Sequence, residues 1–311
     1  MNGTAVIVLG AAGFIGRHVC RQLAAGGYVV SGIGHGSWDP QEQRAWGLSQ
    51  WFGGDITREA LQAAGRGQAI RALVHCAGTS AVAHSYSAPF ADFERSVHSS
   101  ALLLEFTRAH YGSSVRVVLA SSAAVYGDQG DVDLPETATR SPISPYGFSK
   151  VAAENLCDSY SRFFAVPCSV VRLFSVYGEG LRKQLLWDAM CKFKRGAASF
   201  FGTGHELRDW IHVEDAAALL CAAATAEQGM FEVYNGGHVK ASTRDVLLTL
   251  SRRSGCGMTP AFTGETHGGN PRRLTANCAH AMRQLGWSPA VALEEGLARY
   301  ADWFNTRPAT P

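Results

Sequence analysis

Apolar runs of strand length alternate with amphipathic runs of helical length through the first half of this 311-residue chain. The run TAVIVL at 4–9 predicts a buried strand, and the pattern at 14–25 predicts the helix that follows it. Further strands are expected at 28–33, 73–76, 115–120 and 168–174, and further helices at 88–109 and 145–164. This β-α alternation is typical of an α/β fold with a doubly wound parallel sheet.

The regular alternation of strand-length and helix-length runs stops after about residue 175, which indicates a smaller C-terminal lobe. Short strands are expected at 198–201, 209–212 and 231–234, mixed with helices at 183–194, 213–224 and 243–253. We therefore expect a dinucleotide-binding domain at 1–175 and a substrate lobe at 176–311, without a sharp boundary and with room for interleaving. The Gly- and Pro-rich stretch 263–273 is expected to be a surface loop.

The net charge of +2 gives no reason to expect a nucleic-acid or membrane partner. No run of about 20 apolar residues is present, so no membrane span is expected. The N-terminus lacks the basic region of a signal peptide. The eight cysteines form no C-x-x-C pair, which favours a reducing cytoplasm and argues against a disulfide framework or a metal site.

The motif VIVLGAAGFIGRH places three glycines between the first strand and the first helix. Glycines here allow a tight turn, a close approach of backbone to pyrophosphate and close helix–strand packing. The helix N-terminus adds free N–H groups that attract phosphate. We expect a Rossmann-type phosphate-binding loop formed by Gly10, Gly13, Phe14, Ile15 and Gly16.

The second strand reads YVVSGIGHG and ends without the acid that usually holds the adenosine ribose. Gly34 occupies the expected position of the acid, and His35 follows it. The cofactor is therefore expected to be NAD or NADP. Arg17 and His35 are the candidate partners of a 2′-phosphate.

Two further motifs are expected to contact the dinucleotide. In GGDIT, Asp55 can accept the adenine amino group, and Ile56 can pack on the adenine ring. In LVHCAG, a strand ends in small residues that let the cofactor lie against bare backbone. The residues of this second group are Cys76, Ala77 and Gly78.

The stretch SPYGFSK holds Tyr146 and Lys150, four residues apart on an expected helix and therefore on one face. An ammonium near a phenol stabilises the phenolate, which suits a proton donor and acceptor. In LASSAAVYG, Ser121 and Ser122 end the fifth strand, where ligands bind in open α/β sheets. Each feature alone is more often ordinary surface, but together and in this order they indicate a catalytic set.

The chain resembles the extended short-chain dehydrogenase/reductases that act on nucleotide sugars. The resemblance covers nearly the whole chain and rests on GAAGFIG, GDIT, HCAG, SSAAVYG, SPYGFSK, RLFSVYG, RDWIHVEDAA and LGWSPAVALEEGL. It implies that Ser122, Tyr146 and Lys150 are catalytic, with Ser122 rather than Ser121 matching the serine. It also implies a homodimer that pairs the helices expected at 88–109 and 145–164.

Departures from the family pattern narrow the activity. Family dehydratases carry an Asp-Glu pair where this chain has Ala123 and Ala124, and related decarboxylases keep a glutamate at the second position. What remains is a redox reaction at a sugar carbon, either reversible or one-way. We favour a reversible 4-epimerase, in which Tyr146 removes the C4 hydroxyl proton while hydride passes to the nicotinamide and back. The alternative is an NADPH-dependent 4-ketoreductase. A non-catalytic dinucleotide sensor is a third reading, disfavoured by the intact Ser-Tyr-Lys set.

The resemblance also implies a site for a nucleotide-diphosphate sugar in the second lobe. Arg208 matches an arginine that binds substrate phosphate, and a planar guanidinium suits paired oxygens. Ser175 replaces a usual asparagine, and HGGN at 267–270 replaces a usual R-P-G-D, so Arg272 or Arg273 is expected to supply the missing arginine. Base and sugar are expected to contact Gln184 and the backbone near Phe200–Phe201, with their identities left open.

Overall fold

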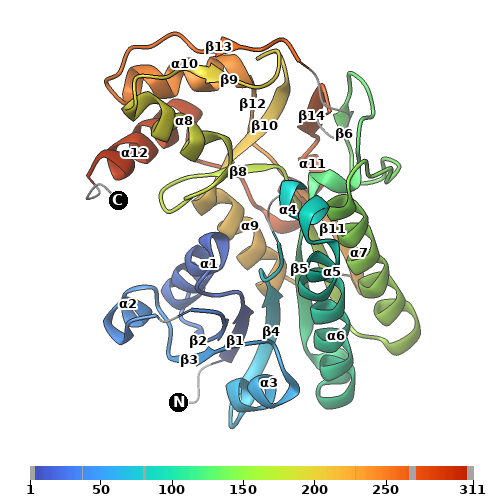
Figure 1. The fold of residues 1–311 in the computed structure, drawn as a ribbon. Helices are drawn as coiled ribbons and strands as arrows, with labels where there is room; N and C mark the ends of the chain where they lie inside the picture. Colours follow the sequence, from blue (N-terminus) through green and yellow to red (C-terminus); the bar gives the residue numbers. More distant parts are fainter. Residues whose placement is uncertain (1–3, 37, 80–81, 228, 266–270, 307–311) are drawn as a thin grey trace.

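The computed structural model describes residues 4–36, 38–79, 82–227, 229–265 and 271–306. A seven-stranded parallel sheet forms its centre (Figure 1). In spatial order the strands are β11 (Phe231–Gly236), β7 (Cys168–Leu173), β5 (Arg116–Ser122), β4 (Ala69–His75), β1 (Thr4–Leu9), β2 (Val29–Gly34) and β3 (Gln50–Gly53). The expected α/β fold with a Rossmann-type doubly wound sheet is confirmed.

Strand β1 is apolar almost throughout because both of its faces are buried. Val6 and Val8 pack into one core, and Ile7 and Leu9 pack into another on the opposite face. Because successive side chains point to opposite faces of a strand, burial on both faces requires a continuous apolar run.

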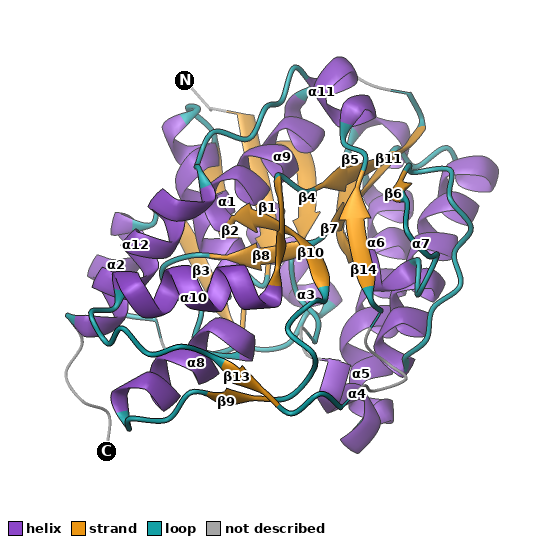
Figure 2. Ribbon diagram, turned by 90° about the horizontal axis from the view of Figure 1, so that it is seen from above, coloured by secondary structure: helices purple, strands orange, loops and turns teal. Residues whose placement is uncertain are grey.

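Helices cover both faces of the sheet (Figure 2). Helices α1 (Phe14–Ala25) and α9 (Val213–Thr225) pack on the face of Val6 and Val8. Helices α3 (Arg58–Gly65), α6 (Ser99–His110) and α7 (Pro145–Phe164) pack on the face of Ile7 and Leu9. The short helix α2 (Pro40–Ala45) lies at the edge of the molecule, and α11 (Ala279–Leu285) packs against α9 and β11. The parallel strands therefore lie between two helical layers.

The helix expected at 88–109 forms, but not as one continuous α-helix. It divides into α5 (Pro89–Phe93), a π-helical turn (Glu94–His98) and α6, and it is preceded by α4 (Val82–Ser87). Ser99 and Ser100 donate from their hydroxyls to the carbonyls of Arg95 and Ser96, four residues earlier. Such bonds compete with the regular ladder and bend helices, and π-turns often lie near functional sites.

A smaller sheet is built around β10 (Leu207–His212), which pairs with β8 (Ser175–Tyr177), β12 (Val239–Ser242) and β14 (Arg273–Ala276). Strand β14 also pairs with β6 (Asp133–Leu134). Helices α8 (Gln184–Lys194), α10 (Thr243–Arg253) and α12 (Leu293–Asn305) form the core of this lobe, beside the ribbon of β9 (Ser199–Phe200) and β13 (Ala261–Phe262).

The two sheets do not divide cleanly along the sequence. Strand β6 precedes residue 175 and belongs to the second sheet, whereas α9 and β11 follow it and pack in the first sheet. The loop expected at 263–273 holds Thr263–Glu265 and Pro271–Arg272, while β14 begins at Arg273; 266–270 lie outside the described residues. No helix in the described ranges is both long and apolar enough to cross a bilayer.

Candidate active site

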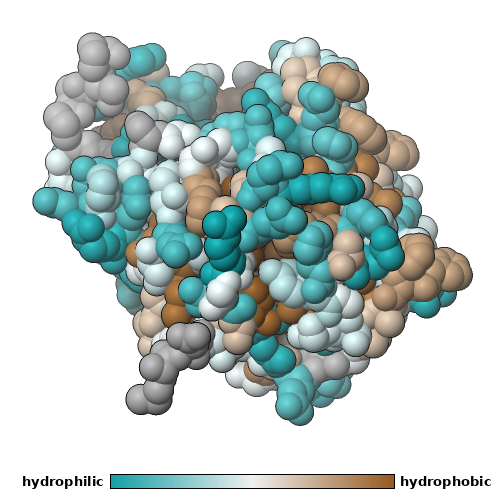
Figure 3. All heavy atoms as spheres, turned by 90° about the horizontal axis from the view of Figure 1, so that it is seen from below, coloured by the Kyte–Doolittle hydropathy of each residue, from teal (hydrophilic) through white to brown (hydrophobic). Residues whose placement is uncertain are grey.

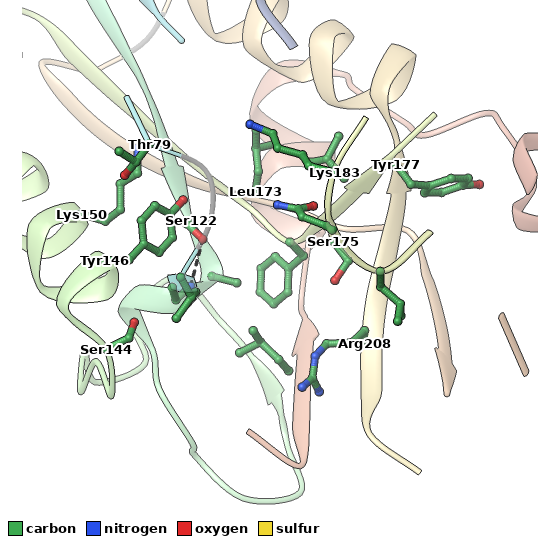
Figure 4. Close-up of a pocket in the computed structure, with 18 of the residues that line it drawn as sticks. Thr79, Ser122, Ser144, Tyr146, Lys150, Leu173, Ser175, Tyr177, Lys183 and Arg208 are labelled. Carbon is green, nitrogen blue, oxygen red and sulfur yellow. Dashed lines mark hydrogen bonds between the residues drawn. The ribbon is translucent and has the colours of Figure 1, made fainter. Parts of the chain in front are cut away.

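A cavity of about 800 Å³ opens between the carboxyl ends of the central strands and the second lobe. Its walls come from the loops after β1, β4, β5 and β7 on one side, and from β8, α8 and β10 on the other. Ligands in open α/β sheets bind at this edge, where the order of the strands reverses. Figure 4 shows the side chains that project into the cavity from both sides.

The phosphate loop forms one end of the cavity. Strand β1 ends at Leu9, and Gly10 adopts a left-handed φ of 76°, which favours glycine. A Cβ atom on Gly16 would lie 2.1 Å from the carbonyl oxygen of Gly10, so only glycine allows α1 to pack this closely. Gly13 precedes the first residue of α1 and has no side chain to cap it. The N–H groups of the first turn therefore remain available to a phosphate.

Small residues at the end of β4 form the adjoining wall, which Cys76, Ala77 and Gly78 line. Burial raises the pKa of the Cys76 thiol to about 12, so this cysteine stays protonated and unreactive. Burial, with a smaller effect of Lys150, lowers the pKa of His75 to about 3. The ring of His75 is therefore neutral, with Nε2 3.0 Å from the hydroxyl of Ser99.

Tyr146 and Lys150 project from the first two turns of α7. The helix begins because the Ser144 hydroxyl accepts from Gly147 N at 3.2 Å and Pro145 occupies the first helical position. The backbone N–H of Tyr146 donates to the Ser85 hydroxyl at 3.0 Å. Lys150 Nζ donates to the carbonyl of Ala120 at 3.1 Å and lies 5.7 Å from the centre of the Tyr146 ring.

The two serines at the end of β5 have different surroundings. Ser121 is buried and donates to Glu154 Oε1 at 2.6 Å, and Glu154 also accepts from Arg172 at 2.8 Å. The Ser122 hydroxyl accepts from Ala124 N at 3.2 Å and lies beside Tyr146 (Figure 4). Of the two, Ser122 is therefore placed to meet a ligand, and Ser121 fixes the strand beneath it.

Residues of the second lobe face this group across the cavity. Arg208 Nη1 donates to the carbonyl of Leu207 at 2.8 Å, at the start of β10. Burial lowers the pKa of Arg208, and the acidic groups of Glu206 and Asp128 oppose this effect. An arginine remains charged in such a site, so Arg208 supplies positive charge there. The lobe also contributes Ser175, Gln184 and Phe201 to the wall.

Some expected site residues lie outside this cavity lining. His35 and Asp55 follow the carboxyl ends of β2 and β3. Their side chains are largely exposed, and His35 Nε2 lies 2.9 Å from Asp55 Oδ1. Ile56 packs at the edge of the core under Ile7 and Leu9. The glycines Gly10 and Gly16 shape the loop from behind the lining, as their backbone contacts show.

The structure does not bring Arg272 into the cavity. Its side chain is exposed. Pro271 and Leu274, which flank the Arg272–Arg273 pair, belong to the lining of the cavity. Arg273 forms ion pairs with Asp131 and Asp133 instead. The stretch 267–270, expected to take part in the same contacts, lies outside the described residues.

The cavity also contains residues that the motifs do not mark. Thr79 follows HCAG directly, and its hydroxyl donates to the buried Asp92. Lys183 lies just before α8, and burial lowers its pKa. The position after a strand end could have indicated Thr79. Nothing in the sequence marks Lys183, because the fold of the second lobe brings it to this wall.

Comparison with known proteins shows the family of this chain. The model of the NAD-dependent epimerase/dehydratase family matches residues 6–237. A UDP-glucose 4-epimerase of Azospirillum brasilense is 30% identical over 95% of this chain and 90% of its own length. A dTDP-glucose 4,6-dehydratase of Escherichia coli is 28% identical over 76% of this chain and 73% of its own length.

The same likeness holds in three dimensions. The structure of the UDP-glucuronic acid 4-epimerase of Bacillus cereus, in complex with UDP-glucuronic acid and NAD, matches 97% of this chain and 99% of its own with a TM-score of 0.86 and 26% identity. The phosphate loop, the fold and the match over most of the chain agree. The chain belongs to the NAD-dependent epimerase/dehydratase family, enzymes of the extended short-chain dehydrogenase/reductase type that act on nucleotide sugars.

Proposed function

We propose that this protein is a nucleotide-sugar 4-epimerase. The observation that carries the proposal is the cluster of Ser122, Tyr146 and Lys150 at one wall of the cavity, beside the phosphate loop and opposite Arg208. A single cavity therefore contains both the residues proposed to transfer the proton and the residue proposed to bind the substrate. The similar 4-epimerases of Azospirillum brasilense and Bacillus cereus support the same reaction.

Tyr146 is the proposed general base and acid. Its ring centre lies 5.7 Å from Lys150 Nζ, so both side chains are on the same side of α7. Ser122 is placed to hold the reacting sugar oxygen by a hydrogen bond, within reach of the same phenol. In the proposed reaction Tyr146 takes the C4 hydroxyl proton on oxidation and returns it on reduction.

The residues at the phosphate loop and the adjoining wall fit a dinucleotide. The uncapped start of α1 attracts a pyrophosphate, and the small residues Ala77 and Gly78 allow close approach along the adjoining wall. A bound nicotinamide supplies the reversible hydride acceptor that oxidation at C4 requires. Lys150, Tyr146 and Ser122 then orient the sugar and move its proton.

Ala123 and Ala124 argue against elimination of water, the reaction of the related dehydratases. These two residues follow Ser122 in a short 3₁₀ turn at the cavity wall and carry only methyl groups. Elimination needs an acid and a base at the leaving hydroxyl, and two methyl groups supply neither. The dehydratase match therefore supports the shared fold and oxidation step, and not loss of water.

Arg208 is the proposed partner of the substrate diphosphate. A planar guanidinium binds two phosphate oxygens at once, and burial strengthens such a contact. Arg208 lies across the cavity from Tyr146, on the same side as Ser175 (Figure 4). The sugar would then lie between the diphosphate and the catalytic tyrosine.

A 4-ketoreductase is the second candidate function. It is favoured by one observation: Gly34, at the end of β2, offers no carboxylate that would repel the 2′-phosphate of NADPH. Incubation with UDP-sugars without added cofactor separates the two functions. The epimerase inverts C4 under these conditions, whereas the reductase consumes NADPH and requires a keto-sugar.

We also infer a homodimer formed through α5, α6 and α7. Hydrophobic residues gather on the side of the molecule where α6 and α7 lie (Figure 3). Helix α5 exposes Phe90 and Phe93, and α7 exposes Phe148, Phe163 and Phe164. Exposed phenylalanines on adjacent helices are typical of a protein interface, and a second copy would cover them.

A further inference from the structure

Thr79 places a hydroxyl on the cavity wall, directly after the small residues that follow β4. Figure 4 shows it on the same side of the cavity as Tyr146 and Lys150. A Cβ atom on the neighbouring Gly78 would lie 3.6 Å from Lys150 Nζ, so this part of the wall adjoins the proposed catalytic lysine. A ligand that reaches Lys150 therefore also meets the wall at Thr79.

The orientation of this hydroxyl is set by Asp92, which lies behind the wall. Asp92 belongs to α5 and is completely buried, and its Oδ1 atom accepts the hydrogen bond that the Thr79 hydroxyl donates. A hydroxyl has one hydrogen and two lone pairs, and here the hydrogen is already used. The Thr79 oxygen can therefore only accept a hydrogen bond from a ligand, and its bond to Asp92 makes it a stronger acceptor.

The surroundings of Asp92 make a purely structural role costly. Within the part of the chain that the structure describes, Asp92 Oδ2 has no hydrogen-bond partner, and neither has the Oγ atom of Ser96, four residues later in the π-helical turn. Ser96 Oγ lies behind the same part of the wall, 3.4 Å from where a Cβ atom on Gly78 would be. Buried polar atoms without partners cost free energy, and an apolar pair would join α5 to the wall without that cost. The polar pair therefore indicates a role toward a ligand.

Both ligands of the proposed function carry groups that fit such an acceptor. A nucleotide sugar offers sugar hydroxyls, and a dinucleotide offers the hydroxyls of its nicotinamide ribose. Ionised carboxylates and phosphates have no hydrogen to donate and would face the lone pairs of the Thr79 oxygen. Lys150 is a donor, so Thr79 adds an acceptor to this part of the wall. The two residues together suit a group that both accepts and donates, which is a hydroxyl.

We propose that Thr79 binds a hydroxyl group of the ligand as a hydrogen-bond acceptor, and that Asp92 is the positioning residue that orients it. The hydroxyl belongs to the nucleotide sugar or to the nicotinamide ribose, and binding measurements separate the two sources. The inference rests on the ligand sites of the proposed function but not on the type of sugar reaction.

Variants at these two positions distinguish a ligand contact from a structural bond. Thr79→Val keeps the shape of the side chain and removes the acceptor, whereas Thr79→Ser keeps the hydroxyl. In the double variant Thr79→Val with Asp92→Leu, both partners are apolar, so no buried carboxylate loses its donor. Thr107→Val is the matched control, because the Thr107 hydroxyl is buried on α6, away from the cavity lining, and donates to the carbonyl of Leu103 at 2.8 Å.

Calorimetry measures the affinity of the full-length protein for UDP-glucose, for UDP and for NADH, and melting temperatures show which variants fold. We expect Thr79→Val and the double variant to weaken at least one of UDP-glucose and NADH roughly 3- to 10-fold, the scale of a lost hydrogen bond, and to leave UDP within about twofold. Weaker binding of UDP-glucose identifies a sugar hydroxyl, and weaker binding of NADH identifies the nicotinamide ribose. Thr79→Ser should retain the affinity, and Thr107→Val should change none of the three.

Two single variants test the positioning role of Asp92. Asp92→Asn should retain the affinity of the same ligand, because an amide oxygen also accepts the Thr79 hydrogen. Asp92→Leu should weaken it about twofold or more, because the hydroxyl is then free to turn. Equal affinity in Asp92→Leu and the unmodified protein would show that Asp92 does not orient Thr79.

Two results would overturn the proposal. One is a folded double variant that binds UDP-glucose and NADH as tightly as the unmodified protein. The other is equal weakening of all three ligands, which would show a distorted cavity. If the unmodified protein did not bind UDP-glucose, the nucleotide-sugar site would be contradicted and the NADH measurements would decide alone. Normal binding without C4 inversion would contradict only the proposed epimerase reaction.

Discussion

Lys150 lies one helical turn after Tyr146, with its Nζ atom 5.7 Å from the centre of the phenol ring. Both residues belong to the first turns of α7, whose start is fixed by Ser144 and Pro145. Lys150 also donates to the carbonyl of Ala120 in β5, which ties the helix to the strand that ends in Ser122. The spacing of the proposed catalytic groups is therefore set by backbone elements and not by flexible loops.

Replacing Tyr146 by phenylalanine should reduce turnover by roughly 100-fold or more, the scale of a lost general acid and base. The ring would remain, so we expect an unchanged melting temperature. The matched control is Tyr160→Phe on the same helix, whose hydroxyl donates to Glu105 and does not line the cavity. Near-normal turnover of purified Tyr146→Phe would show that another group moves the proton.

Replacing Arg208 by alanine should weaken binding of a nucleoside diphosphate roughly 10- to 100-fold, since a charge-assisted contact to phosphate is lost. Dinucleotide binding should stay nearly unchanged. Arg272→Ala is the comparison, because Arg272 is exposed outside the cavity lining. Calorimetry with UDP measures both. If Arg272→Ala weakened UDP binding more than Arg208→Ala, the diphosphate would lie at the late loop instead.

The exposed face of α7 should form part of a homodimer. We expect light scattering at micromolar concentration to give twice the chain mass, and Phe163→Asp to shift it toward the monomer by placing a charge in an apolar contact. Met282→Asp on α11 is the control, since Met282 is also an exposed apolar residue but lies on a different helix. A monomer mass for the unmodified protein would contradict this prediction.

Acidification should destabilise the fold through His18. Neither ring nitrogen of His18 has a hydrogen-bond partner among the described residues, and the ring packs against Trp46 at 5.0 Å. Burial, assisted by Arg21, lowers the pKa of His18 from 6.5 to about 4. The unfolded chain therefore binds a proton that the folded chain rejects between these values, so stability falls as the pH falls from 6.5 toward 4.

The size of this effect is on the order of 1–3 kcal/mol, because each unit of pKa shift corresponds to about 1.4 kcal/mol. Urea unfolding at pH 7.5 and at pH 5 measures it. His18→Phe should lose less stability on acidification than the unmodified protein, and His205→Gln, at an exposed position, should lose the same amount. An unaltered pH dependence in His18→Phe would rule out His18 as the source.

The central strands and long helices could be predicted because burial on both faces leaves a strong apolar signal. The helix Phe14–Ala25 has the predicted bounds, and so does Pro145–Phe164, where Ser144 and Pro145 mark the start. The break between α5 and α6 could not be predicted, because it depends on serine-to-backbone bonds within a continuous helical pattern. Strand β6 could not be predicted either, because it has only two residues and pairs with β14, which lies far along the chain.

The proposed catalytic residues could be predicted because local motifs hold them at strand and helix ends. Tyr146 and Lys150 need only one helix to share a face. The opposite wall could not be predicted in the same way, since Lys183 reaches the cavity only because the second lobe folds over the sheet. Arg272 was expected in the cavity by analogy with a family motif, but its exposed side chain lies outside the lining.

The most direct test is to incubate the protein as purified with UDP-glucose, and separately with UDP-glucuronic acid, without added cofactor, and to follow the configuration at C4 by NMR. Tyr146→Phe serves as the matched control. We expect inversion at C4 of at least one nucleotide sugar, together with a tightly held dinucleotide released on denaturation. Turnover that occurs only with a 4-keto nucleotide sugar, and that consumes added NADPH in proportion to product, would contradict the epimerase and identify a reductase.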